Sequence, residues 1–153
     1  MTHSELVEIG YEWIMKTAKC SFAFKELRTY AKETPDVIGW KNNSSVLIEC
    51  KASRSDFLAD VHKGFRRRGG VGNYRFYLAP AGLLNADDIP FKWGWLEAGE
   101  KGSIVRRIAP KGNVWADWPR FEANLQAEAI MLQSALRRIQ RKVNIQSFLS
   151  GIK

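Results

Sequence analysis

The sequence predicts an α/β protein in which helices flank a central sheet. Apolar residues recur at helical spacing near the start of the chain and again in its last third. Between these stretches lie short apolar runs of strand length, separated by turn-forming residues. With 153 residues, the chain is expected to form one domain, with a core at about residues 4–110 and a long C-terminal helix at about 117–147.

The first half of the core is expected to contain a helix, three strands and a second helix. The first helix covers residues 4–17, with Ser4 as its N-cap. The strands are expected at residues 20–27, 37–40 and 45–52. Asn42-Asn43-Ser44 is a turn signal between the last two strands. Either Ser53 or Ser55 caps the helix that follows.

The second half begins with a glycine-rich basic loop at residues 66–72, followed by a strand at 73–79. Residues 93–97 and 103–108 predict a hairpin. Asp117 is the expected N-cap of the last helix, and Pro119 lies in its first turn. This helix has an apolar stripe at near-heptad spacing, made of Phe121, Leu125, Leu132, Leu136, Ile139 and Val143. Such a stripe most often packs against its own domain, and a homodimer contact is the alternative.

Charge is unevenly distributed along the chain, whose net charge is +8. Residues 1–60 contain eight Lys and Arg and nine Asp and Glu, whereas residues 61–153 contain sixteen and seven. Clustered carboxylates suit a metal site, and clustered basic residues suit a polyanion. No apolar run is long enough for a membrane span. The two cysteines, Cys20 and Cys50, lie in hydrophobic segments and are expected to be buried free thiols in a reducing compartment.

Asp36, Glu49 and Lys51 are the candidate catalytic residues. Side chains alternate along a strand, so Glu49 and Lys51 are expected to project to the same side, while Cys50 points into apolar packing. A hairpin pairing would bring Asp36 near Glu49. Two carboxylates at one point form an oxygen site suited to Mg²⁺ or Mn²⁺. The alternative interpretation is structural, with Asp36 as a turn or cap residue and Glu49 and Lys51 as a salt bridge on an edge strand.

Pro35-Asp36, the apolar strand and Glu49-Cys50-Lys51 resemble the signature of the PD-(D/E)xK nuclease superfamily. Residues 49–60, 73–80 and 93–96 also resemble its bacterial and phage branch of MmcB-type DNA-repair endonucleases. The resemblance covers about residues 5–110. It implies a restriction-endonuclease-like αβββαβ core with a mixed sheet flanked by helices. It also implies cytoplasmic localisation, in a bacterial cell or a phage-infected host.

The family often adds a glutamate from the first helix to the metal ligands. Glu12 and Glu8 are candidates for this position, and Glu26, near the end of the first strand, is another. Taken one at a time, each is more often a solvated surface charge. His3 and His62 do not have the spacing of a metal-ligand pair.

A basic segment with no acidic residue follows the second helix. The segment carries five positive charges, on Lys63, Arg66, Arg67, Arg68 and Arg75. These charges predict salt-dependent binding to a phosphate backbone, with DNA as the expected partner. A solvated loop is the alternative. A second basic cluster could extend this surface or form the polar face of the last helix, and it comprises Arg137, Arg138, Arg141 and Lys142.

The leading functional hypothesis is a Mg²⁺- or Mn²⁺-dependent DNA endonuclease that hydrolyses phosphodiester bonds in duplex or branched DNA. The task would be DNA repair, recombination or DNA degradation in a bacterium or phage. The alternative is a catalytically inactive nuclease-fold module that binds nucleic acid or a partner protein. RNA stays open as a substrate.

Overall fold

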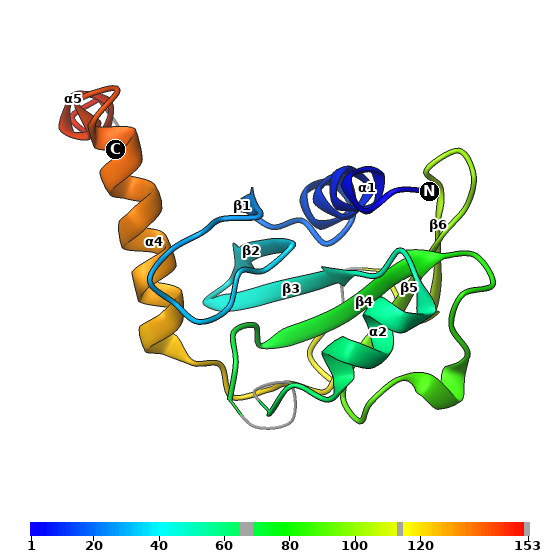
Figure 1. Cartoon of the computed structure of the whole chain (residues 1–153). Helices are drawn as coiled ribbons and strands as arrows, with labels where there is room; N and C mark the ends of the chain where they lie inside the picture. The colour runs from blue at the N-terminus through cyan, green and yellow to red at the C-terminus, as the bar shows by residue number, and fades with distance from the viewer. Residues whose placement is uncertain (65–68, 113–114, 152–153) are drawn as a thin grey trace.

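The computed structural model describes residues 1–64, 69–112 and 115–151 (Figure 1). Its strands form one mixed sheet in the order β1-β2-β3-β4-β5-β6, so neighbours in the sheet are neighbours in the sequence. The strands are β1 (Phe22–Lys25), β2 (Val37–Lys41), β3 (Ser44–Cys50), β4 (Tyr74–Pro80), β5 (Gly94–Ala98) and β6 (Ile104–Ile108). Strands β3, β4 and β5 run parallel to one another, and the outer pairs are antiparallel.

The predicted strands and the β5–β6 hairpin are confirmed, with ends shifted by a few residues. The turn between β2 and β3 is also confirmed. Asn42 and Asn43 have φ angles of 48° and 61°, the left-handed conformation that asparagine tolerates better than most residues. This tight turn sets Val37 opposite Ile48, so the residues before β2 and at the end of β3 meet at one edge of the sheet.

Helix α1 (His3–Lys16) begins one residue earlier than predicted, because Thr2 rather than Ser4 is its N-cap. The Thr2 hydroxyl accepts from the Glu5 N–H, and the Glu5 carboxylate accepts from the Thr2 N–H, which is a capping box. The buried side of α1 packs on one face of the sheet, where Leu6 and Ile14 join Ile48 in one apolar core. Because the helix starts at His3, this residue lies in its first turn.

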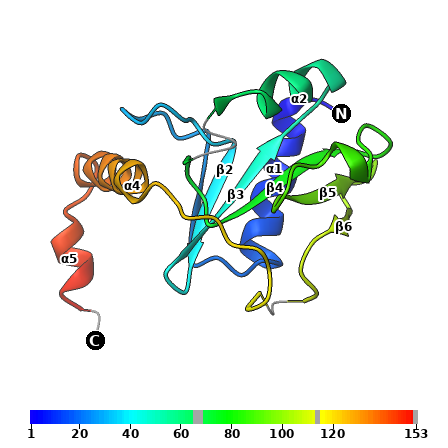
Figure 2. The ribbon, with the colours of Figure 1, turned by 90° about the horizontal axis from the view of Figure 1, so that it is seen from below.

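Helix α2 (Arg54–Val61) connects β3 to the parallel strand β4 on the opposite face of the sheet (Figures 1 and 2). Of the two predicted caps, Ser53 is the residue whose hydroxyl accepts from the Asp56 N–H. Phe57 packs against Tyr77 in the second core, with ring centroids 5.0 Å apart. A short 3-10 helix, η1 (Ala86–Asp88), lies between β4 and β5 and is joined to α2 by the Arg54–Asp88 salt bridge.

The prediction of one helix at residues 117–147 is wrong. Helix α4 covers Leu125–Gln140 with Asn124 as its N-cap, and a separate helix α5 covers Ile145–Leu149. Residues 117–124 are not helical because their backbone bonds to the sheet end instead. The Phe121 N–H donates to the Asn73 carbonyl at 2.7 Å, and the Asn124 N–H donates to the Gly70 carbonyl at 2.8 Å.

Apart from Phe121, which packs against the second core, most of the predicted apolar stripe does not face the core either. The core-facing positions of α4 are Glu128, Met131, Ser134 and Ala135. Four members of the predicted stripe are instead exposed, namely Leu125, Leu136, Ile139 and Val143. The end of α4 and all of α5 extend away from the sheet (Figures 1 and 2). No helix within the described residues is long and apolar enough to cross a membrane.

Candidate metal centre

The three predicted catalytic residues line one pocket, beside the start of β2 and the end of β3. Asp36 directly precedes β2, Glu49 lies near the end of β3, and Lys51 directly follows β3. We call this cavity of about 380 Å³ the Asp36 pocket. Its lining residues are His3, Lys32, Glu33, Thr34, Asp36, Glu49, Cys50, Lys51, Asp56 and Lys63.

Glu49 and Lys51 project to the same side, as strand alternation predicts. The Lys51 Nζ lies 3.6 Å from the Glu49 Oε2, and both residues are about 95% buried. A buried charge is costly unless it is paired, so these two groups stabilise each other at the pocket wall. Cys50, between them, has its side chain in the apolar core on the α1 side.

Asp60 is a third charged group in contact with Lys51, and sequence reasoning missed it. It lies on the buried side of α2, one turn after Phe57, and is 1% exposed. Its Oδ1 lies 3.4 Å from the Lys51 Nζ and 3.2 Å from the Lys63 Nζ. Its Oδ2 accepts a hydrogen bond from the Tyr77 hydroxyl at 2.8 Å. Asp60 therefore helps to fix the position of the Lys51 ammonium.

The Asp36 carboxylate is fixed by the strand beside it. Its Oδ2 accepts a hydrogen bond from the Cys50 N–H at 2.7 Å. Burial raises the pKa of Asp36, while the Cys50 N–H and the nearby His3 and Lys51 charges lower it and offset part of that rise. A partly buried carboxylate with one oxygen already fixed is well placed to offer its other oxygen to a cation.

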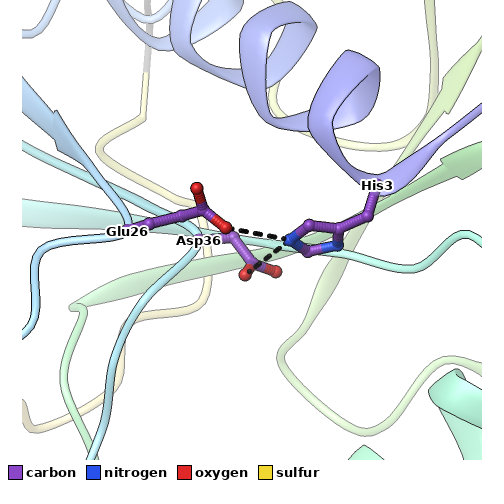
Figure 3. A group of neighbouring side chains, drawn as sticks. All are labelled: His3, Glu26 and Asp36. Atoms are coloured by element: carbon purple, nitrogen blue, oxygen red, sulfur yellow. Dashed lines mark ion pairs between the residues drawn. The ribbon is translucent and has the colours of Figure 1, made fainter.

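The structure adds His3 and Glu26 to Asp36 (Figure 3). The His3 Nε2 lies 3.4 Å from the Asp36 Oδ1 and 3.4 Å from the Glu26 Oε1. The first turn of α1 carries the histidine, and Glu26 follows β1 directly. Glu26 was a candidate ligand from the sequence. His3 was not, because its spacing from His62 gave no signal and the predicted helix began after it; Thr2 as N-cap is what places His3 in the first turn.

Glu8 and Glu12, the other two candidate ligands, lie away from this group. The Glu8 Oε1 pairs with the Lys25 Nζ at 2.6 Å, and the Glu12 Oε2 pairs with the Lys16 Nζ at 3.1 Å. Both glutamates line a different pocket, between α1 and the β5–β6 turn. The residue of α1 that lies beside Asp36 is therefore His3, five residues before Glu8 and nine before Glu12.

The predicted basic residues separate into three groups. Lys63 lines the Asp36 pocket. Arg66, Arg67 and Arg68 lie outside the described residues. Arg75 is 1% exposed and packs over the Phe121 ring at 4.0 Å, and its guanidinium donates to the Gly72 and Gly70 carbonyls. The prediction that Arg75 meets phosphate was wrong, because it ties the loop before β4 to the chain before α4.

His3, Glu26 and Asp36 could together hold a small divalent cation. One atom each from His3, Glu26 and Asp36 lies within 4.8 Å of the other two. Two atoms that each lie about 2.1 Å from one metal ion are separated by about 3.0–3.5 Å, which matches the 3.4 Å separations of this group. Carboxylate oxygens suit Mg²⁺ and Mn²⁺, and an imidazole nitrogen adds preference for a transition metal such as Mn²⁺.

Comparison with known proteins supports the fold. No protein-family model matches the chain, and no curated protein matches it. A solved structure of SPO1766, a protein of unknown function from Silicibacter pomeroyi, is similar with a TM-score of 0.60 at 21% sequence identity. The match covers 95% of this chain and 94% of that one, so almost the whole α/β architecture has a counterpart.

Proposed function

We propose that the protein is a divalent-metal-dependent nuclease with a restriction-endonuclease-like core, which hydrolyses phosphodiester bonds in DNA. The observation that carries the proposal is the joint lining of one pocket by Asp36, Glu49 and Lys51. The order of elements also supports it. A leading helix, an antiparallel three-stranded meander, a crossover helix and a parallel strand is the arrangement that the PD-(D/E)xK resemblance implies.

Asp36 and Glu49 are the ligands that the family pattern assigns to the cation, and His3 and Glu26 are the additional donors beside Asp36. When bound, a divalent cation supplies charge stabilisation at the phosphate and lowers the pKa of an attacking water. Asp36 is fixed for this role by the Cys50 N–H. The four donors come from α1, the β1–β2 loop and β3, so only the folded chain brings them together.

Lys51 acts on the reacting groups directly in this proposal. Its ammonium orients the attacking water and offsets the negative charge that develops on the phosphate. Asp60 is a positioning residue, because its carboxylate contacts Lys51 and Lys63 and is itself fixed by Tyr77. Lys32 and Lys63 at the pocket wall add positive charge that suits a phosphodiester.

The deciding experiment incubates the purified full chain with plasmid, linear duplex, single-stranded and branched DNA and with RNA, in Mg²⁺, Mn²⁺ or chelator. We expect cleavage with the metals and none with chelator. Lys51→Ala is expected to reduce the cleavage rate by at least about a hundredfold, the range for loss of one group that stabilises transition-state charge. Lys16→Ala, which removes a lysine far from the pocket, is the matched control and should cleave normally.

Folding of the Lys51→Ala variant is checked by circular dichroism and urea unfolding, since Asp60 loses one partner but keeps Lys63 and Tyr77. Asp60→Asn tests positioning and should lower kcat with little change in KM. Cleavage that persists in chelator, or in a folded Lys51→Ala variant, would contradict the proposal. Salt-sensitive DNA binding without cleavage of any substrate would instead favour the inactive binding module.

A further inference from the structure

The C-terminal region carries a basic pocket of its own. After Glu128, residues 129–153 contain five Lys and Arg and no Asp or Glu. Arginines of α4 face the loop between β1 and β2 across a cavity of about 320 Å³, which we call the arginine pocket. It is lined by Arg28, Thr29, Tyr30, Ser134, Arg137, Arg138 and Arg141. Four of these described lining residues are arginines and none is acidic.

The β1–β2 loop, whose path is seen in Figure 1, contributes lining residues both to this pocket and to the Asp36 pocket. Between the two lies a third cavity of about 400 Å³, also walled by the loop and by the start of α4. It shares Tyr30 with the arginine pocket, and it shares Lys32 and Glu33 with the Asp36 pocket. The three cavities are therefore neighbours along residues 28–36, and we refer to them together as one surface.

Among the described residues, the middle cavity and the arginine pocket together are lined by five basic residues and one carboxylate. Glu33, the acidic residue between the pockets, is 8% exposed, and its Oε2 accepts the Val71 N–H at 2.7 Å. Its carboxylate is thus turned into the protein. Guanidinium groups gathered in one pocket repel one another, and an anion between them removes that repulsion. Guanidinium is also the side-chain group that matches phosphate geometry with two parallel hydrogen bonds.

Tyr30 adds an aromatic ring to the same surface. It is 88% exposed, and it stands where the arginine pocket meets the middle cavity. An exposed ring among arginines is the combination that holds a nucleic-acid strand, with bases stacked on the ring and phosphates on the guanidiniums. The exposed apolar residues of α4 would also suit a second copy of the chain or a membrane. A second copy would bring two arginine clusters together, and a flat membrane surface would not follow a concave surface toward Asp36.

We propose that the arginine pocket binds backbone phosphates of the nucleic-acid substrate, and that the bound strand continues along residues 28–36 to the Asp36 pocket. This inference rests on the proposed nuclease function and adds a remote anchor to it. The α4 arginines would then set how far from the anchored phosphates the strand is cut. Oligonucleotides too short to span both pockets would bind more weakly than longer ones.

The first test measures binding of a fluorescein-labelled single strand and its duplex by anisotropy, in chelator so that cleavage does not compete. Arg137→Ala/Arg141→Ala is compared with Lys101→Ala/Lys111→Ala, which removes the same charge from exposed positions near β6. We expect the arginine variant to lose about tenfold or more in affinity. We also expect the slope of log affinity against log salt to fall by about 1.4–1.8, the value for two lost phosphate contacts. The lysine variant should change less than about threefold.

The second test locates the strand. An oligonucleotide containing 5-iodouracil is irradiated with the protein, and the crosslinked tryptic peptides are identified by mass spectrometry. We expect crosslinks to the peptide of residues 29–32, which contains Tyr30, and we expect Tyr30→Ala to remove them. Crosslinks confined to other parts of the chain would overturn the inference.

The outcomes separate the two proposals. If the arginine and lysine variants weaken binding equally while the protein still cleaves DNA, the remote anchor is wrong and the nuclease proposal stands. If the wild type binds and cleaves no nucleic acid, both fail. If the wild type instead binds vesicles containing anionic lipid, and only the arginine variant loses that binding, the arginine pocket belongs to a membrane contact and the inference is overturned.

Discussion

At the scale of single residues, His3 is the group that most changes the expected chemistry. An all-carboxylate pocket would favour Mg²⁺, whereas an imidazole nitrogen 3.4 Å from the Asp36 and Glu26 oxygens favours a transition metal. We predict that the chain binds Mn²⁺ more tightly than Mg²⁺, and that His3→Ala weakens Mn²⁺ binding by about tenfold or more. Isothermal titration calorimetry, or the loss of the electron paramagnetic resonance signal of free Mn²⁺, measures this affinity independently of cleavage.

His62→Ala is the matched control for His3, because it removes the other histidine of the chain at the end of α2. It should leave Mn²⁺ affinity unchanged. Asp36→Asn should weaken Mn²⁺ binding at least as much as His3→Ala, since it removes a charged carboxylate from the group. If all three variants bind Mn²⁺ with the affinity of the wild type, the cation is held elsewhere.

The two thiols give a prediction about reactivity and pH. Burial raises the pKa of Cys20 to about 11 and raises that of Cys50 well above its usual range. Native protein at pH 8 should therefore react with a thiol reagent far more slowly than the unfolded chain. Because burial raises the folded-state pKa values, keeping the two thiols protonated stabilises the folded chain. This stabilisation is complete below about pH 9 and is lost as the pH rises toward 11.

Unfolding in urea at pH 8 and pH 10.5 measures that loss, with Cys20→Ala as the comparison that lacks one of the two thiols. The wild type should lose more stability than the variant over this interval. Rapid labelling of native protein at pH 8 would contradict the buried position of both thiols.

At the scale of elements, one carboxylate attaches α4 to the sheet. Glu128 is 4% exposed. Its Oε2 accepts from the Ser45 hydroxyl at 2.8 Å and from the Gly72 N–H at 2.9 Å, and its Oε1 accepts from the Trp40 Nε1 at 3.2 Å. These donors come from β2, β3 and the turn before β4, so a single side chain joins four segments.

We predict that Glu128→Ala lowers the free energy of unfolding by about 2–4 kcal/mol, because it leaves buried donors without an acceptor. Glu122→Ala, at an exposed position six residues earlier, is the control and should change stability by less than about 0.5 kcal/mol. Urea denaturation followed by tryptophan fluorescence measures both values. A neutral effect of Glu128→Ala would mean that water replaces the lost acceptor.

The same carboxylate explains why the position of the last helix could not be predicted from hydrophobicity. The stripe of large apolar residues suggested one buried face, but the structure buries a face built from Glu128, Ser134 and Ala135 around Met131. Polar residues become core-facing only when distant segments supply hydrogen-bond partners. No local pattern records that Ser45 and Gly72 will be those partners.

At the scale of the whole molecule, prediction succeeded where burial or a tight turn fixes the local composition. Strand β3 is buried along its whole length, so its continuous apolar run identified it, and Asn42-Asn43 fixed its pairing with β2. The meeting of Asp36, Glu49 and Lys51 follows from that hairpin. His3 lines the same pocket from α1, and Asp60 contacts its lining residue Lys51 from α2 on the opposite face of the sheet, so this convergence depends on tertiary packing alone.

The contact between Asp60 and Tyr77 gives the molecule an optical reporter of its own pocket. The Tyr77 ring stacks on Trp93 with centroids 4.3 Å apart, and its hydroxyl bonds the carboxylate that holds Lys51. Occupation of the pocket shifts charge around Asp60 and should change the emission of Trp93. The wild-type minus Trp93→Phe difference spectrum isolates this signal from the other five tryptophans. Titration with Mn²⁺ or a phosphodiester could then be followed by intrinsic fluorescence, and a difference spectrum that does not respond would show that Trp93 is insensitive to the pocket.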